Sequence, residues 1–267
     1  MSTALRPLST GELLDRTFSL YRTHFVLFVG IFALPHICVL AFQLLMLGFP
    51  PLFQVFAAIG ILLVSLVVTA ASQAATVVAV SQVHLDRPAG ILESFSKVKN
   101  QIAGVIGLSL YVGLLVGLAT LALIVPGIWL TICWSLAVPA KVLENLGVSQ
   151  ATARSTQLTQ GNRGRVFVMW FLFIVISVGV AMLLQWPIEL AAGVSSAVNA
   201  KHALQHVDVI WQVASAVATF ISQCLVGPLA TIAFSLVYYD ERVRKEAFDL
   251  QLMMATIDAP GLQAASA

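Results

Sequence analysis

The chain is dominated by long apolar segments, separated by short segments that hold almost all of its charge. No charged residue occurs between Lys99 and Lys141, a stretch too long for one membrane crossing. Because a membrane-spanning helix needs about 20 mostly apolar residues, we predict an all-α membrane protein with six transmembrane helices. They are expected at roughly 25–48, 53–83, 102–123, 126–143, 165–190 and 208–239, with Pro126-Gly127 marking a tight turn between the third and fourth.

The composition excludes an ordinary soluble domain. Hydrophobic residues make up 59% of the 267 residues and charged residues 10%, whereas soluble chains carry about 25% charged residues. The formal net charge of +2 is too small to indicate a nucleic-acid partner. Cys38, Cys133 and Cys224 all lie in apolar stretches, so neither a disulfide framework nor a zinc site is expected.

The basic residues predict how the chain is oriented. With the six spans in place, thirteen of the 14 Lys and Arg residues fall on one side, and Lys201 is the exception. Positive residues concentrate on the cytoplasmic side of membrane proteins. We therefore expect a multi-pass protein of the bacterial inner membrane with both termini in the cytoplasm.

Each pair of spans is preceded by a short amphipathic segment, at about residues 9–22, 90–100 and 147–161. In the first, Ser9 and Glu12 have the spacing of a capping box, and the apolar face is expected to hold Leu14, Phe18 and Tyr21. In the second, the expected apolar face holds Ile91, Leu92, Phe95 and Val98. Such helices lie in the headgroup plane. We expect three repeats of an interfacial helix plus a transmembrane hairpin, in one domain over 1–256, with 257–267 a disordered cytoplasmic tail.

Polar residues inside the spans give a first set of candidate functional positions. In the second span a polar stripe occupies one helical face, either for hydrogen bonds between helices or as the wall of a polar pathway. His36, near the middle of the first span, is expected to be neutral and bonded to a neighbouring helix. Gly113 and Gly117 in the third span predict close helix packing. The candidate intramembrane polar face is His36, Ser65, Thr69, Ser72, Gln73 and Thr76.

Arginines at the cytoplasmic ends of the spans give a second set. Cationic side chains there attract anionic headgroups, so anionic lipids are the expected partners, together with a protein partner at the same face. Opposite charges four residues apart, Asp240 with Arg244, Glu241 with Lys245 and Arg242 with Glu246, should extend the last helix out of the membrane. The candidate surface is Arg16, Arg22, Arg154, Arg163, Arg165, Arg242 and Arg244.

Catalytic and metal-binding patterns are not found in the sequence. It contains no G-x-S-x-G, P-loop, H-E-x-x-H or G-x-G-x-x-G motif. We expect no catalytic residues, no cofactor and no metal. Ion-coupled transporters commonly bury several carboxylates, and this chain places none near the middle of a span; Glu189 is expected at the outer end of the fifth span, in contact with water.

Three stretches together resemble a bacterial membrane family, the membrane domain of glycerophosphoryl diester phosphodiesterases. They are the segment from Arg6-Pro7-Leu8-Ser9 to Arg22, the middle stretch from Pro126-Gly127 to Gly161-Asn162, and Tyr238-Tyr239-Asp240 through Asp249. The resemblance implies a multi-pass helical membrane domain. In the namesake proteins this domain is joined to a soluble phosphodiesterase domain, which has no counterpart in this sequence, so the resemblance does not imply enzymatic activity here.

The sequence leaves two functions open. The leading hypothesis is a non-enzymatic scaffold or accessory protein for membrane or envelope processes, acting through its cationic cytoplasmic face. The alternative is a transporter or flippase-like carrier of a lipid or small amphiphile. A carrier needs a polar cavity that reaches the middle of the membrane, whereas a scaffold can be packed solid.

Overall fold

The computed structural model describes residues 8–47, 49–85, 87–198 and 205–246. These residues form ten α-helices and no strand. The helices are α1 (Thr10–Thr23), α2 (Phe25–Met46), α3 (Pro51–His84), α4 (Ile91–Val98), α5 (Ile102–Ala122), α6 (Ile124–Trp134), α7 (Ala137–Glu144), α8 (Val148–Thr159), α9 (Arg163–Val198) and α10 (Gln205–Glu246). The predicted tail, 257–267, lies outside the described residues.

Six helical segments are long and apolar enough to cross a membrane, which confirms the all-α, multi-pass membrane class. They are Phe25–Met46, Phe56–His84, Ile102–Ala122, Ile124–Glu144, Arg163–Ser195 and Val209–Glu246. The helix of the fifth span extends further than predicted, since α9 continues to Val198. The continuation of α10 to Glu246 agrees with the predicted extension of the last helix beyond its span. Both contain an internal proline, Pro187 and Pro228, yet neither helix is interrupted there.

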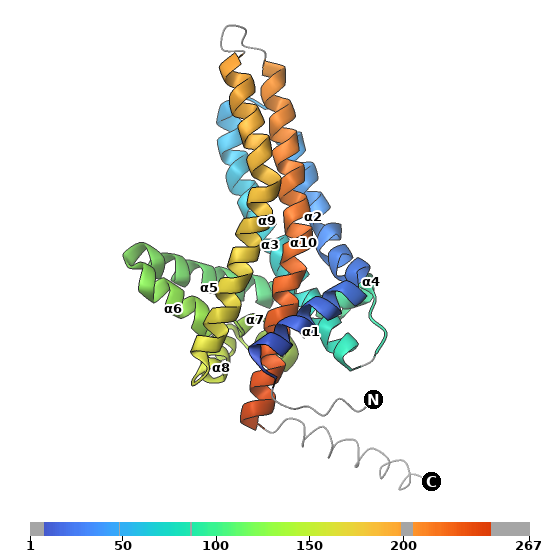
Figure 1. Cartoon of the computed structure of the whole chain (residues 1–267), viewed down its shortest axis with the longest axis vertical. Coiled ribbons are helices and arrows are strands. Elements are labelled where there is room, and N and C mark those ends of the chain that lie inside the picture. The colour runs from blue at the N-terminus through green and yellow to red at the C-terminus, as the bar shows by residue number, and fades with distance from the viewer. Residues whose placement is uncertain (1–7, 48, 86, 199–204, 247–267) are drawn as a thin grey trace.

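Four of these helices, α2, α3, α9 and α10, stand side by side as a bundle (Figure 1). We call the end that carries α1, α4, α7 and α8 the base, and the opposite end, where α2 and α9 end and α3 and α10 begin, the top. The buried core lies toward the base. On α9, for example, the buried apolar residues Val166, Met169 and Phe173 all fall in its first turns.

Small residues allow the bundle helices to approach closely near the base. Ala70, Ala74, Ala75 and Ala79 of α3 are all buried. Gly227 of α10 lies against α2 so closely that a Cβ there would be 2.3 Å from the ring of Phe32. Lipid offers no hydrophobic drive for helix association, so such close packing supplies much of the stability.

The α5–α6 hairpin projects sideways from the bundle and does not run alongside it (Figure 1). Its turn is at Leu123, whose backbone is extended, and Pro126 and Gly127 lie inside the first turns of α6, so the predicted position of the turn was wrong. Proline is tolerated there because the first amides of a helix have no partner within the helix. Gly127 allows close contact, since a Cβ would be 2.8 Å from Thr120 Cα.

The close packing predicted at Gly113 and Gly117 is not observed. Both glycines are exposed, and a Cβ at either position would meet nothing within 4 Å. The spacing of small residues was present in the sequence, but Gly113 lines a cavity between α5 and α3, and no helix packs closely against either glycine. The close approach in the hairpin is made one turn further on, between Thr120 and Gly127.

The fourth predicted span is broken into α6 and α7 at Ser135-Leu136, just before Pro139. Ser155 of α8 compensates for the break. Its hydroxyl accepts a hydrogen bond from the amide of Leu136 at 3.1 Å and donates one to the carbonyl of Cys133 at 2.7 Å. Backbone groups freed by a helix break must find such partners in an apolar environment.

The short helices at the base agree in part with the predicted amphipathic segments. The capping box of Ser9 and Glu12 is confirmed. In α1, Leu13 and Thr17 are buried and Phe18 of the predicted apolar face is 44% exposed. In α4, Val98 is buried and Leu92 is 72% exposed. Within the protein α1 packs against α10 and α4 against α3, and the placement of the exposed apolar residues in the headgroup plane stays a prediction.

Candidate functional site

A cavity of about 590 Å³ lies near the top of the bundle, between all four of its helices. This volume falls in the range of small-molecule sites. The apolar part of its wall comes mainly from Met46, Leu47, Ala57, Ala58 and Ile61 on the α2–α3 side. The α9–α10 side is the more polar one. The polar and aromatic lining residues are Gln43, Glu189, Trp211, Gln212, Ser215 and Thr219.

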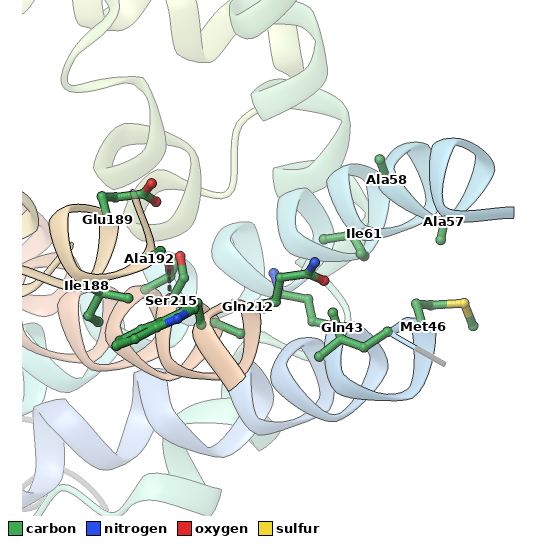
Figure 2. Close-up of a pocket in the computed structure, with 14 residues that line it drawn as sticks. Gln43, Met46, Ala57, Ala58, Ile61, Ile188, Glu189, Ala192, Gln212 and Ser215 are labelled. Carbon is green, nitrogen blue, oxygen red and sulfur yellow. Dashed lines mark hydrogen bonds between the residues drawn. The ribbon is translucent and has the colours of Figure 1, made fainter. Parts of the chain in front are cut away.

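The charged and apolar ends of this upper cavity are separated in space. Figure 2 shows Glu189 of α9 on one side of the group of lining residues and Met46 and Ala57 on the other, with Gln212 between them. The indole Nε1 of Trp211 donates a hydrogen bond to Ser195 Oγ at 2.9 Å, which fixes the ring in the wall. The cavity therefore has its one charged lining residue at one end and a mainly apolar wall at the other.

A second cavity, of about 230 Å³, lies next to the first and deeper in the bundle. The two share Gln43, Ile61 and Thr219 in their walls. Thr219 Oγ1 donates to the carbonyl of Ser215 at 2.9 Å and accepts from Gln185 Nε2 at 3.2 Å. The other polar residues of this middle cavity are His36, Ser65, Thr69 and Gln223.

His36 is 5% exposed and lies in the wall of the middle cavity. Its Nδ1 is 2.8 Å from the carbonyl oxygen of Phe32, so Nδ1 carries the proton and donates, and the two rings stack with centroids 5.6 Å apart. The histidine is thus bonded to its own helix, one turn back, and not to a neighbouring helix as predicted. This tautomer leaves Nε2 as a hydrogen-bond acceptor.

A third cavity, of about 420 Å³, lies between α3, α5 and the α6–α7 segment. It shares Ser65 and Thr69 with the middle cavity and adds Gln73 and Ser109. We call it the lateral cavity, because it opens beside the hairpin that leaves the bundle. Three cavities with shared walls therefore follow one another from the top of the bundle to its side.

The predicted polar stripe on α3 divides between these cavities and the core. Ser65, Thr69 and Gln73 line cavities, which fits the wall of a polar pathway. Ser72 and Thr76 are completely buried, and neither hydroxyl oxygen has a hydrogen-bond partner among the described residues. Ser65, Thr69 and Gln73 follow one another at four-residue intervals, and only this side of the polar face has open space beside it.

Charged residues at the base form two ion-pair clusters, which we call together the basal clasp. In the first, Arg154 Nε of α8 lies 3.0 Å from both oxygens of Glu144, and its guanidinium also contacts Glu246. Tyr238 donates to Glu144 at 2.6 Å, and Arg242 Nε lies 3.1 Å from Glu246. Two arginines face two glutamates, so the cluster is neutral.

The second cluster joins α9 to the end of α10 and to the chain before α1. Arg165 pairs with Asp240 and Glu241, whose side chains are 2% and 0% exposed. Arg244 Nε lies 2.8 Å from Asp240. Both arginines also donate to the carbonyl of Leu8, at 2.7 and 2.6 Å. This cluster too contains two positive and two negative side chains.

The clasp contains Arg154, Arg165, Arg242 and Arg244, four of the seven candidate surface arginines. Burial alone would lower the pKa of Arg154, but its hydrogen bonds to Glu246 and Glu144 outweigh burial and raise the pKa above its ordinary value.

Two predicted helix pairs, Asp240 with Arg244 and Arg242 with Glu246, are confirmed. The third is not formed, because Glu241 pairs with Arg165 and Lys245 donates to the carbonyls of Gln157 and Gln160.

The other three candidate arginines lie outside the clasp. Arg22 is exposed. Arg16 Nη2 lies 3.5 Å from His84 Nδ1, and the guanidinium of Arg163 stacks 4.3 Å from the ring centroid of Trp129. Binding of anionic lipid by this surface stays a prediction, now centred on these three residues.

Four further polar residues line the upper and middle cavities but were not predicted as site residues, namely Gln43, Gln212, Thr219 and Gln223. The signal was present, since a glutamine within an apolar span is costly in lipid unless it has partners or water. Glu189 was expected at the outer end of its span, and it is exposed at the upper cavity.

Comparisons with protein-family models, with curated proteins and with solved structures find no match for this chain. The contacts and cavities described above therefore carry the functional proposal.

Proposed function

We propose that this integral membrane protein is a carrier for a lipid or small amphiphile. The observation that supports the proposal is the series of cavities that share polar wall residues, from Gln43 and Thr219 in the upper cavity to Ser65 and Thr69 in the lateral one. A scaffold has no need for such space. Polar groups that line a cavity inside an apolar bundle are typical of a pathway for a polar headgroup.

The arrangement suggests how the cargo moves. A headgroup enters at the top, passes His36 and the hydroxyls of Ser65 and Thr69, and leaves beside the α5–α6 hairpin while its acyl chain stays in lipid. Below the cavities, the buried core and the basal clasp close the bundle. No catalytic step is part of this proposal.

We further propose that the base faces the cytoplasm of a bacterial cell, because the basic residues gather there. A reporter inserted near Asn199 should then read external and one fused after Ala267 should read cytoplasmic. A cytoplasmic signal at Asn199 would place the top of the bundle in the cytoplasm, and the headgroup would then enter from the cytoplasmic side.

The test of transport uses the full chain in vesicles that contain an acyl-labelled fluorescent phosphatidylethanolamine. Dithionite bleaches only the outer leaflet, so a carrier raises the bleached fraction above about half. Ala192 lines the upper cavity, and Ala192→Phe should slow this exchange by filling it. Ala191, its neighbour on the same helix, does not line that cavity, so Ala191→Phe is the matched control.

The expected result is exchange with the wild-type protein and with Ala191→Phe, and slower exchange with Ala192→Phe. Exchange that is equal in the two variants would mean that lipid does not pass through this cavity. No exchange above protein-free vesicles, for this lipid and for a labelled phosphatidylglycerol, would refute the carrier and leave the scaffold hypothesis.

A further inference from the structure

The upper cavity has a charge that indicates which amphiphiles it takes. Among its lining residues, all within the described part of the chain, Glu189 is the one charged side chain. The remaining polar residues are neutral glutamines, a serine and a threonine. No lysine, arginine or histidine is among the lining residues, so nothing in this wall would hold a phosphate or carboxylate by ion pairing.

Glu189 has no ion pair among the described residues, in contrast to the carboxylates of the basal clasp. It lies in an otherwise apolar stretch of α9, between Ile188 and Leu190. Glu189 lies within the apolar segment Arg163–Ser195, and ionisable residues in membrane-spanning segments commonly mark functional positions. Three residues along the same helix, Ala192 also lines the cavity, so this face of α9 belongs to its wall.

Trp211 gives a second and independent indication. Its indole ring lies in the same wall and is held by the hydrogen bond to Ser195. Indole faces attract ammonium groups more strongly than other aromatic side chains do. A carboxylate and a fixed indole in one cavity are suited to an amine or quaternary ammonium, and the apolar wall at Met46 and Ile61 is suited to the chain that carries it.

We propose that the upper cavity binds amphiphiles whose headgroup is positively charged, with the ammonium group near Glu189 and Trp211 and the hydrocarbon directed toward α2 and α3. This inference rests on the proposed carrier function and specifies its cargo. It applies to single-chain cationic amphiphiles and to the amine end of a zwitterionic lipid, which share the same ammonium chemistry.

The experiment measures binding to the purified full chain in a neutral maltoside detergent. The probes are decyltrimethylammonium, decyl sulfate and decanol, which have the same chain length and positive, negative and no charge. Binding is read from the concentration-dependent rise in unfolding temperature that a ligand of the folded state produces. The variants are Glu189→Gln, Glu189→Asp, Trp211→Leu and, as a control far from the cavity, Glu93→Gln in α4.

The cationic probe should bind the wild-type protein about fivefold more tightly than decanol, as expected for one partly exposed charge pair. Glu189→Gln should abolish this preference, Glu189→Asp and Glu93→Gln should keep it, and Trp211→Leu should reduce it. The short-chain lipids dihexanoylphosphatidylethanolamine and dihexanoylphosphatidylglycerol distinguish the two sources, since preference for the former assigns the site to lipid amines.

Equal affinity for the cationic and neutral probes would overturn the charge preference while leaving amphiphile binding, and hence the carrier, intact. Tighter binding of decyl sulfate would also overturn it. Absence of binding by all three probes would instead count against the cavity as a site, and so against the carrier proposal itself. If the preference for the cationic probe persists in Glu189→Gln, a group other than Glu189 causes it, and the proposed role of Glu189 is overturned.

Discussion

The two halves of the bundle are built from the same four helices but are stabilised differently. Toward the base, alanines and glycine allow close helix contact, and eight charged side chains close the end with two neutral clusters. Toward the top, the helices line partly open cavities with glutamine, threonine and histidine side chains. The difference indicates that stability is concentrated at the base, which leaves the top free to hold a ligand.

The largest effect is expected from Arg165, because it pairs with the buried carboxylates of Asp240 and Glu241 and is, among the described residues, the one arginine paired with Glu241. Arg165→Leu should lower the free energy of unfolding by about 3–5 kcal/mol, the usual cost of leaving a buried charge unpaired. Thermal unfolding in detergent measures this loss. Arg22→Leu, at an exposed position, is the control and should change stability by about 0.5 kcal/mol or less. Similar unfolding temperatures for the two variants would show that the clasp does not stabilise the base.

A smaller effect is expected at Gly227, where α10 contacts α2. Gly227→Ala places a Cβ 2.3 Å from Phe32, so one helix must shift at a cost of about 1–3 kcal/mol. Gly113→Ala in α5, where a Cβ meets nothing within 4 Å, is the matched control and should be neutral or slightly stabilising. If Gly113→Ala is the more damaging change, the open face of α5 is covered in the membrane by another molecule.

Next in size is the loss of anionic-lipid preference. Arg16→Gln with Arg22→Gln removes two base charges that lie outside the clasp, each worth roughly 1 kcal/mol beside an anionic surface. Unfolding temperature in vesicles with and without phosphatidylglycerol should show a reduced difference, and added salt should reduce it further. If the preference for anionic lipid is unchanged in this variant, residues other than Arg16 and Arg22 cause it.

The smallest effect is expected in the upper wall. Gln212→Leu should change the free energy of unfolding by about 0.5 kcal/mol or less, because Gln212 is exposed and lies beside a cavity. The same variant should weaken amphiphile binding. A large loss of stability here would contradict the contrast between the two halves.

The sequence predicted the spans, the capping box at Ser9 and two of the three charge pairs on α10, because all of these depend on residues near one another in the chain. It did not predict the clasp partners, since Arg165 and Asp240 are far apart in sequence and either could have faced water. The polar stripe on α3 was predicted, with a pathway wall as one alternative, and Ser65, Thr69 and Gln73 do line cavities. The glutamines of α2 and α10 that complete the cavity walls were missed for a similar reason. Apolar periodicity is nearly absent in helices that face lipid, so it does not indicate which faces of α2, α3, α9 and α10 meet.

The proline at 139 predicts a kink in the fourth span, but the position of the break could not be predicted. It depends on Ser155, whose single hydroxyl serves both Leu136 and Cys133 across the break. The direction of the α5–α6 hairpin was also beyond the sequence, because length and hydropathy are the same for a helix that stands in a bundle and for one that leaves it.

The sideways hairpin affects the lipid as well as the protein. Both of its ends return to the base, so the orientation of the other four long helices is the same whether or not the hairpin crosses the membrane (Figure 1). With the bundle along the membrane normal, α5 and α6 add cross-sectional area at one depth and none at the top. Such a wedge takes up more room in one leaflet than in the other, and a bilayer relieves that imbalance by bending. The protein should therefore favour membrane whose curvature matches its own shape.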